Sequence, residues 1–364
     1  MSTPLWKRAQ KILCIRLDTV GDIVMTTPAF RALRESENRP GLTLLTSSIG
    51  AAIGRLIPEI DDVLIYDCPW MKATERRASS EIDFDMIARL KAEKFDAAVI
   101  FTVFSQNPLP AALLCYLAEI PLRLAYCREN PYQLLSDWVP EQDSHQQIRH
   151  EVRRQLDLVA SVGASTRNER MSLHVPRKAA DQVHQVLRKT GIDADGQWVV
   201  IHPGASAPSR RYPPEKFAEI AAVLSSELNC QVVFTGSTSE IPLVEEIQAK
   251  VQQKTHSVTG LLNLTELAAL LQLAPLLISN NTGPVHIAAA LGTPVVDIYA
   301  LTNPQHTPWG VESRVLFHDV PCKNCYKSVC PEGHHHCLTL VQTEAVVQAS
   351  QELLAKRVLG FAEG

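Results

Sequence analysis

The hydrophobic pattern of the chain starts with an apolar run at residues 12–17. The run is too short for a helix, and such runs are typical of buried strands in parallel sheets. After Gly21, apolar residues recur at helical spacing from Ile23 to Leu33. We therefore predict a strand, a turn at Gly21 and a helix over residues 11–34, the first half of a βαβ unit, where ligands gather.

Asp22 stands in the first turn of this predicted helix. The helix dipole favours a charged carboxylate there, and that charge repels phosphate, so the turn is a poor phosphate site despite its glycine. Two interpretations stay open. Asp22 caps the helix, as Asp commonly does, or it handles a proton or a hydroxyl group.

The alternation of strand-like and helix-like patterns continues along the chain. In the first half it predicts strands at 42–46, 63–66 and 97–102, and helices at 81–94, 109–118 and 151–162. In the second half it predicts strands at 198–202, 231–235, 276–279 and 295–299, and helices at 213–228, around 245–251, at 264–273 behind an Asn263–Glu266 capping box, and at 285–291.

Two successive β/α alternations of similar size predict two domains, and so does the length of 364 residues. The fold class is α/β, with two Rossmann-like, doubly wound domains facing each other across a cleft that holds the ligand. We expect an N-terminal domain at 1–168, ending in a polar linker at 165–169, and a C-terminal domain at 169–342. A last helix is predicted at 343–359, and its return to the first domain is left open.

Composition narrows the class of protein. Hydrophobic residues make up 46% of the chain and charged residues 20%, as in globular proteins. The net charge of −4 gives no global attraction to nucleic acid, so no nucleic-acid partner is expected. The N-terminus lacks a signal-peptide pattern, and the most apolar stretch, 109–126, contains Glu119 and Pro121. Nine cysteines do not suggest a secreted disulfide scaffold, so a cytoplasmic location is predicted.

A second strand–turn–helix pattern, at 279–286, carries no carboxylate at its helix start. Gly283 is expected at the cap position and Pro284 at the first helical position. The free N–H groups and the Thr282 hydroxyl would then be open to an anion. An ordinary Gly–Pro helix start gives the same pattern, so this site needs support from other residues.

Other loops at predicted strand ends carry candidate ligand-binding residues. Small residues at 203–206 let the backbone approach a ligand closely. Arg210 and Arg211 are suited to neutralise a diphosphate, although surface arginines are common. Glu240 is suited to accept hydrogen bonds from ribose hydroxyls, or it serves as a helix N-terminal charge.

Together these motifs resemble glycosyltransferase family 9, whose best-known members are the ADP-heptose:lipopolysaccharide heptosyltransferases. The resemblance spans nearly the whole chain, from Lys11 to about Cys337. It rests on Gly-Asp at 21–22, His-Pro-Gly at 202–204, Arg-Arg-Tyr-Pro at 210–213, Thr-Gly-Ser at 235–237 and Asn-Thr-Gly-Pro-Val-His at 281–286. It implies the GT-B fold and inverting, metal-independent transfer without a catalytic cofactor.

The resemblance also implies roles for residues of this chain. Asp22 would be the catalytic base, Arg210 the basic residue on the diphosphate and Glu240 a ribose contact. Of the donor site, the resemblance implies Arg210, Glu240, Thr282, Gly283 and His286. The full set of predicted donor-binding residues is His202, Gly204, Ser206, Arg210, Arg211, Gly236, Glu240, Asn281, Thr282, Gly283 and His286. The chain departs from the family at Asn281, where relatives often have Asp, and at Arg210, where some have Lys. The first departure leaves the identity of the donor sugar open.

Four cysteines lie close together in a loop at 321–338, namely Cys322, Cys325, Cys330 and Cys337. Thiolates at this spacing are able to form a tetrahedral structural zinc or iron site, which would leave no open position for catalysis. Similar cysteine-rich loops occur in the resembling heptosyltransferases, and the family branch that glycosylates autotransporter proteins has a cysteine-bound iron. Reduced thiols or a disulfide remain alternatives.

A basic, aromatic loop after a first-domain strand is the candidate acceptor site. In the resembling heptosyltransferases this region meets an anionic inner-core acceptor, but the pattern also fits a solvated loop. The predicted acceptor-binding residues are Gly21, Trp70, Lys72, Arg76 and Arg77, and candidates for the same surface are Arg149, Arg153 and Arg154.

The resulting prediction is an inverting glycosyltransferase that transfers heptose from ADP-heptose to a lipopolysaccharide inner-core acceptor. The acceptor would be lipid-linked, and peripheral contact with the inner face of the membrane is left open. Alternatives are transfer to a protein or a small molecule, a GT-B-type sugar-nucleotide epimerase, or a non-catalytic sugar-nucleotide binding protein. The epimerase would act on the donor alone. The binding protein is disfavoured because Asp22 and the diphosphate-binding residues are present.

Overall fold

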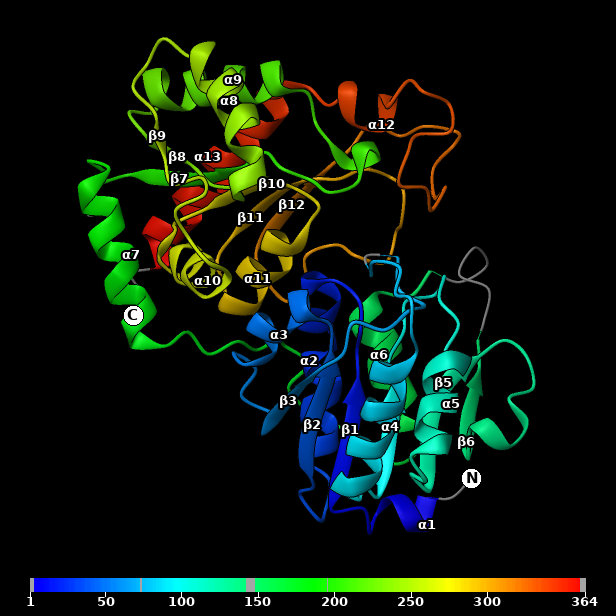
Figure 1. Ribbon diagram of the computed structural model, residues 1–364. Helices are drawn as coiled ribbons and strands as arrows, with labels where there is room; N and C mark the ends of the chain where they lie inside the picture. Colours follow the sequence, from blue (N-terminus) through cyan, green and yellow to red (C-terminus); the bar gives the residue numbers. More distant parts are fainter. Residues whose placement is uncertain (1–2, 73, 142–147, 195, 361–364) are drawn as a thin grey trace. The chain divides into compact units, whose positions relative to one another are not determined.

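The computed structural model describes residues 3–72, 74–141, 148–194 and 196–360, and the chain divides into two compact units after His174. Each unit contains one six-stranded sheet whose strands are all parallel, with helices on both faces (Figure 1). This arrangement confirms the predicted α/β class with two doubly wound sheets. The cleft between the two domains stays a prediction.

The sheet of the first unit has the strand order β3-β2-β1-β4-β5-β6. Helices α2, α3 and α6 pack together on one face, and α4 and α5 pack together on the other. The strands are β1 (Lys11–Ile15), β2 (Gly41–Thr46), β3 (Asp62–Ile65), β4 (Ala97–Ile100), β5 (Leu122–Cys127) and β6 (Asp137–Pro140). The helices are α1 (Thr3–Trp6), α2 (Val20–Arg34), α3 (Ser48–Gly54), α4 (Glu81–Glu93), α5 (Leu109–Leu117) and α6 (Glu151–Ala160).

The sheet of the second unit has the order β12-β11-β10-β7-β8-β9, which repeats the topology of the first. Helices α8, α9 and α13 form one layer, and α7, α10 and α11 form another. The strands are β7 (Trp198–His202), β8 (Gln231–Phe234), β9 (His256–Ser257), β10 (Leu277–Asn280), β11 (Val295–Ile298) and β12 (Ser313–Leu316). The helices are α7 (Arg177–Lys189), α8 (Pro214–Glu227), α9 (Ile241–Ala249), α10 (Leu264–Leu273), α11 (Gly283–Leu291), α12 (His336–Thr339) and α13 (Thr343–Gly360).

The burial of the central strands explains why they could be predicted from apolar runs in the sequence. β1 pairs with β2 on one side and with β4 on the other, and helices cover both faces of the sheet. Successive residues such as Leu13 and Cys14 are therefore both buried, although they point to opposite faces. Strands with a more mixed composition, β5, β6 and β12, were not predicted, and neither were α3 and α7.

The helix starts at both switch-point turns differ by one or two residues from the prediction. Thr19 is the N-cap of α2, so Gly21 lies inside the first helical turn instead of forming the turn itself. Thr282 is the N-cap of α11, so Gly283 is the first helical residue and Pro284 the second. At the cap position the Thr282 side chain makes no capping hydrogen bond. Its hydroxyl, which was expected to be open to an anion, instead donates to the Asn280 carbonyl at 3.3 Å.

The last helix, α13, belongs to the second unit. It packs against α8, β11 and β12, and Val346 and Leu353 are buried in the core of that unit. The return of this helix to the first domain, which the sequence left open, is not what the structure shows. The predicted linker at 165–169 lies in the first unit, where Arg31 Nη1 donates to the Asn168 carbonyl at 2.8 Å. No helix in the described part of the chain is long and apolar enough to cross a membrane.

Candidate functional site

Both candidate sites lie where the strand order of a sheet reverses. In the first unit this point is between β1 and β4, and in the second it is between β7 and β10. In doubly wound sheets the loops after such a strand pair diverge to opposite faces and leave room for a ligand at the carboxyl ends. Asp22 follows β1 and Asn281 follows β10, so the topology brings each residue to such a place.

The first site is built around Arg16, whose side chain is fully buried after the end of β1. Its guanidinium group contacts three carboxylates. Nε lies 3.0 Å from Asp18 Oδ2, and Nη2 lies 3.0 Å from Glu151 Oε1 and 3.5 Å from Asp22 Oδ1. These four residues form what we call the Arg16 cluster, which joins β1, α2 and α6.

The Arg16 cluster carries more negative than positive charge when all three acids are ionised. Burial raises the pKa of Asp18 to about 7, and the charges of Asp22 and Glu151 add to this rise, while Arg16 opposes it. Burial lowers the pKa of Arg16, but the three carboxylates outweigh that effect and its pKa is raised. The cluster therefore keeps its guanidinium charged and readily takes up a proton on an acid.

Asp22 caps α2. Its Oδ2 accepts hydrogen bonds from the backbone N–H of Thr19 at 3.2 Å and from Thr19 Oγ1 at 2.7 Å. Asp22 therefore has the capping contacts that were expected. Capping uses Oδ2, whereas Oδ1 is the oxygen that faces Arg16, so capping alone does not exclude a second role. The role of general base stays a prediction.

Two glutamine side chains support the Arg16 cluster. The Gln106 amide donates to Asp18 Oδ1. Gln155 Nε2 donates to Glu151 Oε1 at 2.6 Å and to the Thr102 carbonyl at 3.0 Å. Because Gln106 and Thr102 follow β4, these bonds tie the cluster to the strand on the other side of the switch point.

The three arginines proposed for an acceptor surface are all engaged within the first unit. Arg154 is buried and pairs with Glu141 and, at 3.7 Å, with Glu151. Arg149 pairs with Asp157 at 3.1 Å, and Arg153 pairs with Glu169. Arg154 thus lies in the core and contacts the Arg16 cluster through Glu151. Its buried guanidinium group needs these acids as partners, so it is not a surface cation.

Two of the predicted acceptor-binding residues have structural partners. Trp70 packs edge-on against Tyr66, with ring centroids 5.7 Å apart, and joins the hydrophobic core of the unit. Arg77 pairs with Asp83 at 2.8 Å, and Tyr66 donates to the same carboxylate at 2.7 Å. These contacts hold the loop in place and leave Trp70 and Arg77 with a structural role.

The rest of the acceptor loop borders the Arg16 cluster. Met71 Sδ lies 3.9 Å from Nε2 of Gln106, the side chain that holds the cluster. Lys72 and Arg76 are exposed, whereas Gly21 is buried in the first turn of α2. Lys72 and Arg76 are the cations of this loop that we keep as predicted acceptor contacts.

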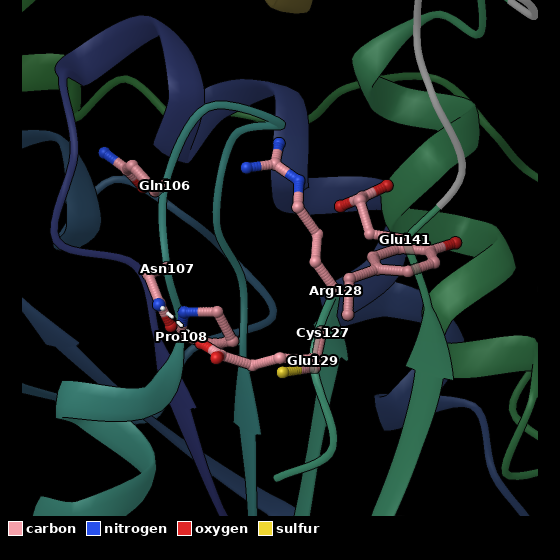
Figure 2. Close-up of a pocket in the computed structure, with 8 residues that line it drawn as sticks. Gln106, Asn107, Pro108, Cys127, Arg128, Glu129 and Glu141 are labelled. Carbon is pink, nitrogen blue, oxygen red and sulfur yellow. Dashed lines mark hydrogen bonds between the residues drawn. The ribbon is translucent and has the colours of Figure 1, made fainter.

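A pocket of about 90 Å³ opens at the carboxyl ends of β5 and β6. In Figure 2, Arg128 and Glu141 lie on one side of it, and Asn107 Nδ2 donates to Glu129 Oε1 at 3.2 Å. Ligand pockets usually measure ~300–1,000 Å³, so this one admits a small polar group and not a nucleotide sugar. Its lining consists of Gln106, Asn107, Pro108, Tyr126, Cys127, Arg128, Glu129 and Glu141.

In the second unit, Glu240 fits against two glycines at the ends of β7 and β8. A Cβ atom on Gly204 would collide with Glu240 Oε1, and one on Gly236 would lie 3.0 Å from Oε2. Oε2 accepts hydrogen bonds from Ser237 N at 2.6 Å and Ser237 Oγ at 2.9 Å, so Glu240 does cap its helical turn. Oε1 faces the Gly204 loop, where the predicted ribose contact would lie.

His202 lies next to Glu240, and its side chain is buried. Burial lowers the pKa of His202, while the charge of Glu240 opposes that effect. Its ring is therefore neutral near pH 7. Ser206, at the other end of the same loop, is exposed.

The two adjacent arginines have different surroundings. Arg211 Nε donates to the Ala205 carbonyl at 2.8 Å, so it braces the loop after β7. The Arg210 side chain makes no hydrogen bond or ion pair to any described residue. Its charge nevertheless opposes the raised pKa of buried Asp297, which places Arg210 near β11. Arg210 is therefore the guanidinium that remains available to a ligand.

The first turn of α11 contains no acidic residue, as predicted for an anion site. Asn280, fully buried just before it, fixes the neighbouring loops. Its Nδ2 donates to the Pro203 carbonyl at 2.7 Å, and its Oδ1 accepts from Tyr212 N at 3.1 Å. One amide thus holds the loop after β7 and the loop of Arg210 beside the helix start.

Two further donor-site predictions, Asn281 and His286, are buried at α11. His286 lies on the second turn of the helix, and its ring is 6.4 Å from that of His306 in an edge-on arrangement. Asn281 donates to Asp297 of β11 at 2.9 Å. The structure therefore brings Asn281, Thr282, Gly283, Arg210 and Asp297 to one end of the second sheet.

The four clustered cysteines are free and partly exposed, so the disulfide alternative finds no support. Burial raises the pKa of Cys337, and the other three thiols add to the rise, so the sulfurs are near one another. Among the residues that the structure describes, no three His, Cys, Asp or Glu side chains are placed to hold a metal ion. The donor atoms suit zinc or iron, but the geometry is not that of an assembled site.

The cysteine loop contacts the residue that precedes Arg210. Ser209 N donates to the Ser328 carbonyl at 3.1 Å, and Ser209 Oγ donates to the Lys327 carbonyl at 2.8 Å. Tyr326 N donates to the Thr302 carbonyl at 2.7 Å. A conformational change in the cysteine loop would therefore move Ser209 and, with it, the adjacent Arg210.

Two charged residues of these sites were missed because each lies within an apolar strand-like run. Arg16 stands in Ile-Leu-Cys-Ile-Arg-Leu, and Asp297 stands in Val-Val-Asp-Ile-Tyr. Burying a charged group is costly unless it is paired, so a charged residue inside such a run is itself a signal of a buried polar cluster. Their partners cannot be read from the sequence, because Glu151 is far from Arg16 along the chain.

The chain is similar in sequence to known proteins along most of its length. The profile of Glycosyltransferase family 9 (heptosyltransferase) matches residues 84–336. The Haemophilus influenzae lipopolysaccharide core heptosyltransferase OpsX is 25% identical over 314 residues, covering 84% of this chain and 83% of the relative. Salmonella typhimurium lipopolysaccharide heptosyltransferase 2 is 23% identical over 359 residues, covering 95% and 99%.

Solved structures share the fold. A glycosyl transferase family 9 protein from Veillonella parvula aligns with a TM-score of 0.82 at 21% identity, covering 95% of this chain and 98% of that one. E. coli ADP-heptose lps heptosyltransferase II aligns at 0.75 and 22% identity, covering 95% and 99%. The iron-containing dodecameric E. coli glycosyltransferase TibC aligns at 0.56 and 15% identity, covering 96% and 77%. The predicted GT-B fold class is thereby confirmed.

The titration of Asp18 gives a first prediction. Asp18 titrates near pH ~4 when unfolded and near pH 7 in the folded protein. Between these values the folded state binds more protons, so the contribution of this group to stability falls as pH rises. The variant Asp18→Asn has no carboxyl group at this position, so it lacks this loss of stability with rising pH. From pH ~4 to ~8, the unfolding free energy of the variant should gain up to about 4 kcal/mol relative to the parent.

Urea unfolding of both proteins at a series of pH values measures this difference. A difference that stays constant with pH would show that Asp18 is ionised throughout and that the Arg16 cluster has no proton to exchange.

Proposed function

From the premise that this chain belongs to glycosyltransferase family 9 and is a glycosyltransferase, we propose that it transfers heptose from ADP-heptose to a lipopolysaccharide inner-core acceptor with inversion at the anomeric carbon. The observation that carries the proposal is the opposite charge at the two equivalent switch points. The start of α2 holds a carboxylate, whereas the start of α11 holds none and has Arg210 nearby.

Asp22 is proposed as the general base in the first unit. In an inverting transfer the acceptor oxygen attacks the anomeric carbon while a base removes the proton from that hydroxyl. The Arg16 cluster suits this task because three carboxylates share one guanidinium, so the cluster gains by taking up one proton. The bond from Thr19 Oγ1 fixes the orientation of Asp22.

Arg210 and the start of α11 are proposed to bind the departing nucleoside diphosphate. As the bond between the sugar and the phosphate breaks, negative charge grows on the leaving oxygen, and preorganised donors stabilise that charge. The N–H group of Gly283, the positive end of the α11 dipole and the guanidinium of Arg210 provide this stabilisation. Pro284 has no N–H group, and that of Val285 donates to the Thr282 carbonyl at 3.0 Å. Glu240 is proposed to accept from the ribose hydroxyls through Oε1.

The choice of sugar and acceptor rests on the relatives. The two curated relatives are described as lipopolysaccharide heptosyltransferases, and one solved structure is described as acting with ADP-heptose. Lys72 and Arg76 are exposed in the loop whose Met71 contacts Gln106, and they suit an anionic acceptor. We propose that the enzyme works in the cytoplasm, at the inner face of the membrane.

A structural zinc or iron bound by Cys322, Cys325, Cys330 and Cys337 is part of the proposal. It would hold the cysteine loop and take no part in the transfer, because four protein ligands leave no position for a substrate. The loop would have to tighten around the ion to bring the thiols together. The bonds from Ser209 to this loop would then keep the adjacent Arg210 in place.

The role of Asp22 is tested by Asp22→Asn, which keeps the shape and a capping oxygen but cannot accept the proton. Turnover should fall by about 100-fold or more, while folding and donor affinity survive. The measurements are the initial rate and the donor dissociation constant. Glu266→Gln is the matched control, because Glu266 occupies the same position in the capping box of α10. Its rate should equal that of the parent, and near-parental turnover in Asp22→Asn would reject the base.

The two arginines are distinguished by single substitutions. Arg210→Ala should weaken ADP binding by roughly 10- to 100-fold, because a diphosphate loses charged hydrogen bonds. Arg210→Lys should recover part of the loss, since it restores the charge but not the planar fork. Arg211→Ala should have a smaller effect, because its hydrogen bonds to described residues go to the carbonyls of its own loop. Calorimetric titration with ADP measures all three, and the reverse order of effects would assign the diphosphate to Arg211.

The metal proposal predicts about one zinc or iron ion per chain in purified protein. Cys325→Ser should lose the ion, lower the melting temperature and weaken ADP binding through the Ser209 contacts. Cys127→Ala, in the first unit, should keep the ion. Elemental analysis and melting curves decide the matter. Metal-free parent protein whose melting is unchanged by Cys325→Ser would mean that the loop is held by its hydrogen bonds alone.

A further inference from the structure

Asp297 is an unusual residue for its place in the fold. It lies in β11 between Val296 and Ile298, and its side chain is completely buried. Burial raises its pKa to about 8, while a bond from Asn281 and the charge of Arg210 oppose the rise. Its Oδ1 has no hydrogen-bond partner among the described residues. An apolar residue would suit the sheet better, so the carboxyl group calls for another explanation.

The side-chain amide of Asn281 is oriented by its neighbours. Its Nδ2 donates to Asp297 Oδ2 at 2.9 Å and to the backbone carbonyl of His306 at 2.9 Å. A backbone carbonyl can only accept, so the amide must turn its NH₂ group toward this side. Both hydrogens are then engaged, one by Asp297 and one by His306.

The carbonyl oxygen of Asn281, Oδ1, is therefore the part of the amide that is not used by Asp297 or His306. No described residue donates to Asn281 Oδ1, and this oxygen is not among the buried polar atoms that lack a partner. It thus keeps some solvent access at the start of α11, although Asn281 is only 4% exposed as a whole. Arg210 is near the same place, because its charge acts on Asp297.

We propose that Asp297 is a positioning residue for the donor sugar, because it holds the amide of Asn281 so that Oδ1 accepts a hydrogen bond from a sugar hydroxyl. The proposal rests on the proposed function, in which this end of the second unit binds a nucleotide sugar. Asp297 itself is too deeply buried to touch the sugar.

In this arrangement, two kinds of protein group contact different parts of the nucleotide sugar. The N–H group of Gly283 at the start of α11 and the guanidinium of Arg210 are hydrogen-bond donors, so they suit the phosphates. Asn281 Oδ1 is an acceptor, so it suits a hydroxyl of the attached sugar and rejects a substituent that has no hydrogen to give. Asp297 thus sets sugar recognition without affecting the nucleotide.

The test compares ADP with ADP-heptose in calorimetric titrations of the full chain. Asp297→Ala should weaken ADP-heptose binding by about tenfold, the effect of one neutral hydrogen bond, and leave ADP binding unchanged. Asp297→Asn should recover the parental affinity, because its side-chain oxygen still accepts from Asn281. Asn281→Ala should lose as much as Asp297→Ala or more, and the double variant should lose no more than Asn281→Ala, since both act through one amide.

Two outcomes of this titration would overturn the proposal. If Asp297→Ala binds both ligands as the parent does, the amide needs no positioning. If it loses ADP and ADP-heptose equally, Asp297 supports the diphosphate site or the fold and not the sugar contact.

A second measurement needs no donor. Asn281→Asp would put a carboxylate against Asp297 and the His306 carbonyl, so it should be stable only while a proton is shared. Its melting temperature should fall more steeply than that of the parent as pH rises from ~6 to ~9. The other titratable or charged groups near the pair, Arg210, Tyr299, His286 and His306, are present in both proteins, so subtracting the parental curve removes their effects.

The melting curves also separate this proposal from the proposed function. If the parent binds ADP-heptose no better than ADP, the heptose donor is wrong, and the melting curves still decide whether the side chain at position 281 contacts Asp297. A variant Asn281→Asp with the parental pH profile would show that it does not, which would overturn the proposal.

Discussion

The first unit depends on the pairing of Arg16 with three carboxylates. A fully buried guanidinium would strongly destabilise the fold if it were left unpaired, and here it joins the end of β1 to the starts of α2 and α6. The same contact that satisfies the charge also places Asp22 at the switch point of the sheet. Stability and the proposed chemistry therefore use one set of atoms. A substitution of Arg16 would affect both together.

The second unit uses the same topology with the opposite charge. Its first turn after the central strand pair has no acid, and buried amides do the positioning that an arginine does in the first unit. Asn280 fixes two backbone loops, and Asn281 is fixed by Asp297 and His306. A repeated fold thus supplies one end suited to a proton and one suited to an anion, which is the division that glycosyl transfer requires.

The sequence allowed most of the strands and helices to be predicted, because parallel strands buried on both faces leave apolar runs and their helices leave a periodic pattern. Residues at the helix starts, such as Asp22, Thr282 and Gly283, were also placed at the correct end of each sheet. The contacts that give these residues their properties were not predictable. Arg16 meets Glu151 only through the fold, and Asn281 meets Asp297 across two neighbouring strands. Edge strands such as β12 were not predicted, because their residues are only half-buried and do not form a continuous apolar run.

The most direct test of the account is the release of ADP from ADP-heptose by the purified chain, measured with and without an inner-core lipopolysaccharide acceptor. ADP should appear only when the acceptor is present and in equal amount to the glycosylated product, and the new glycosidic bond should have the inverted configuration. Conversion of the donor without any acceptor would instead indicate an epimerase or a hydrolase. Binding of ADP-heptose without turnover in the presence of the acceptor would contradict the assignment of this donor and acceptor pair to the enzyme.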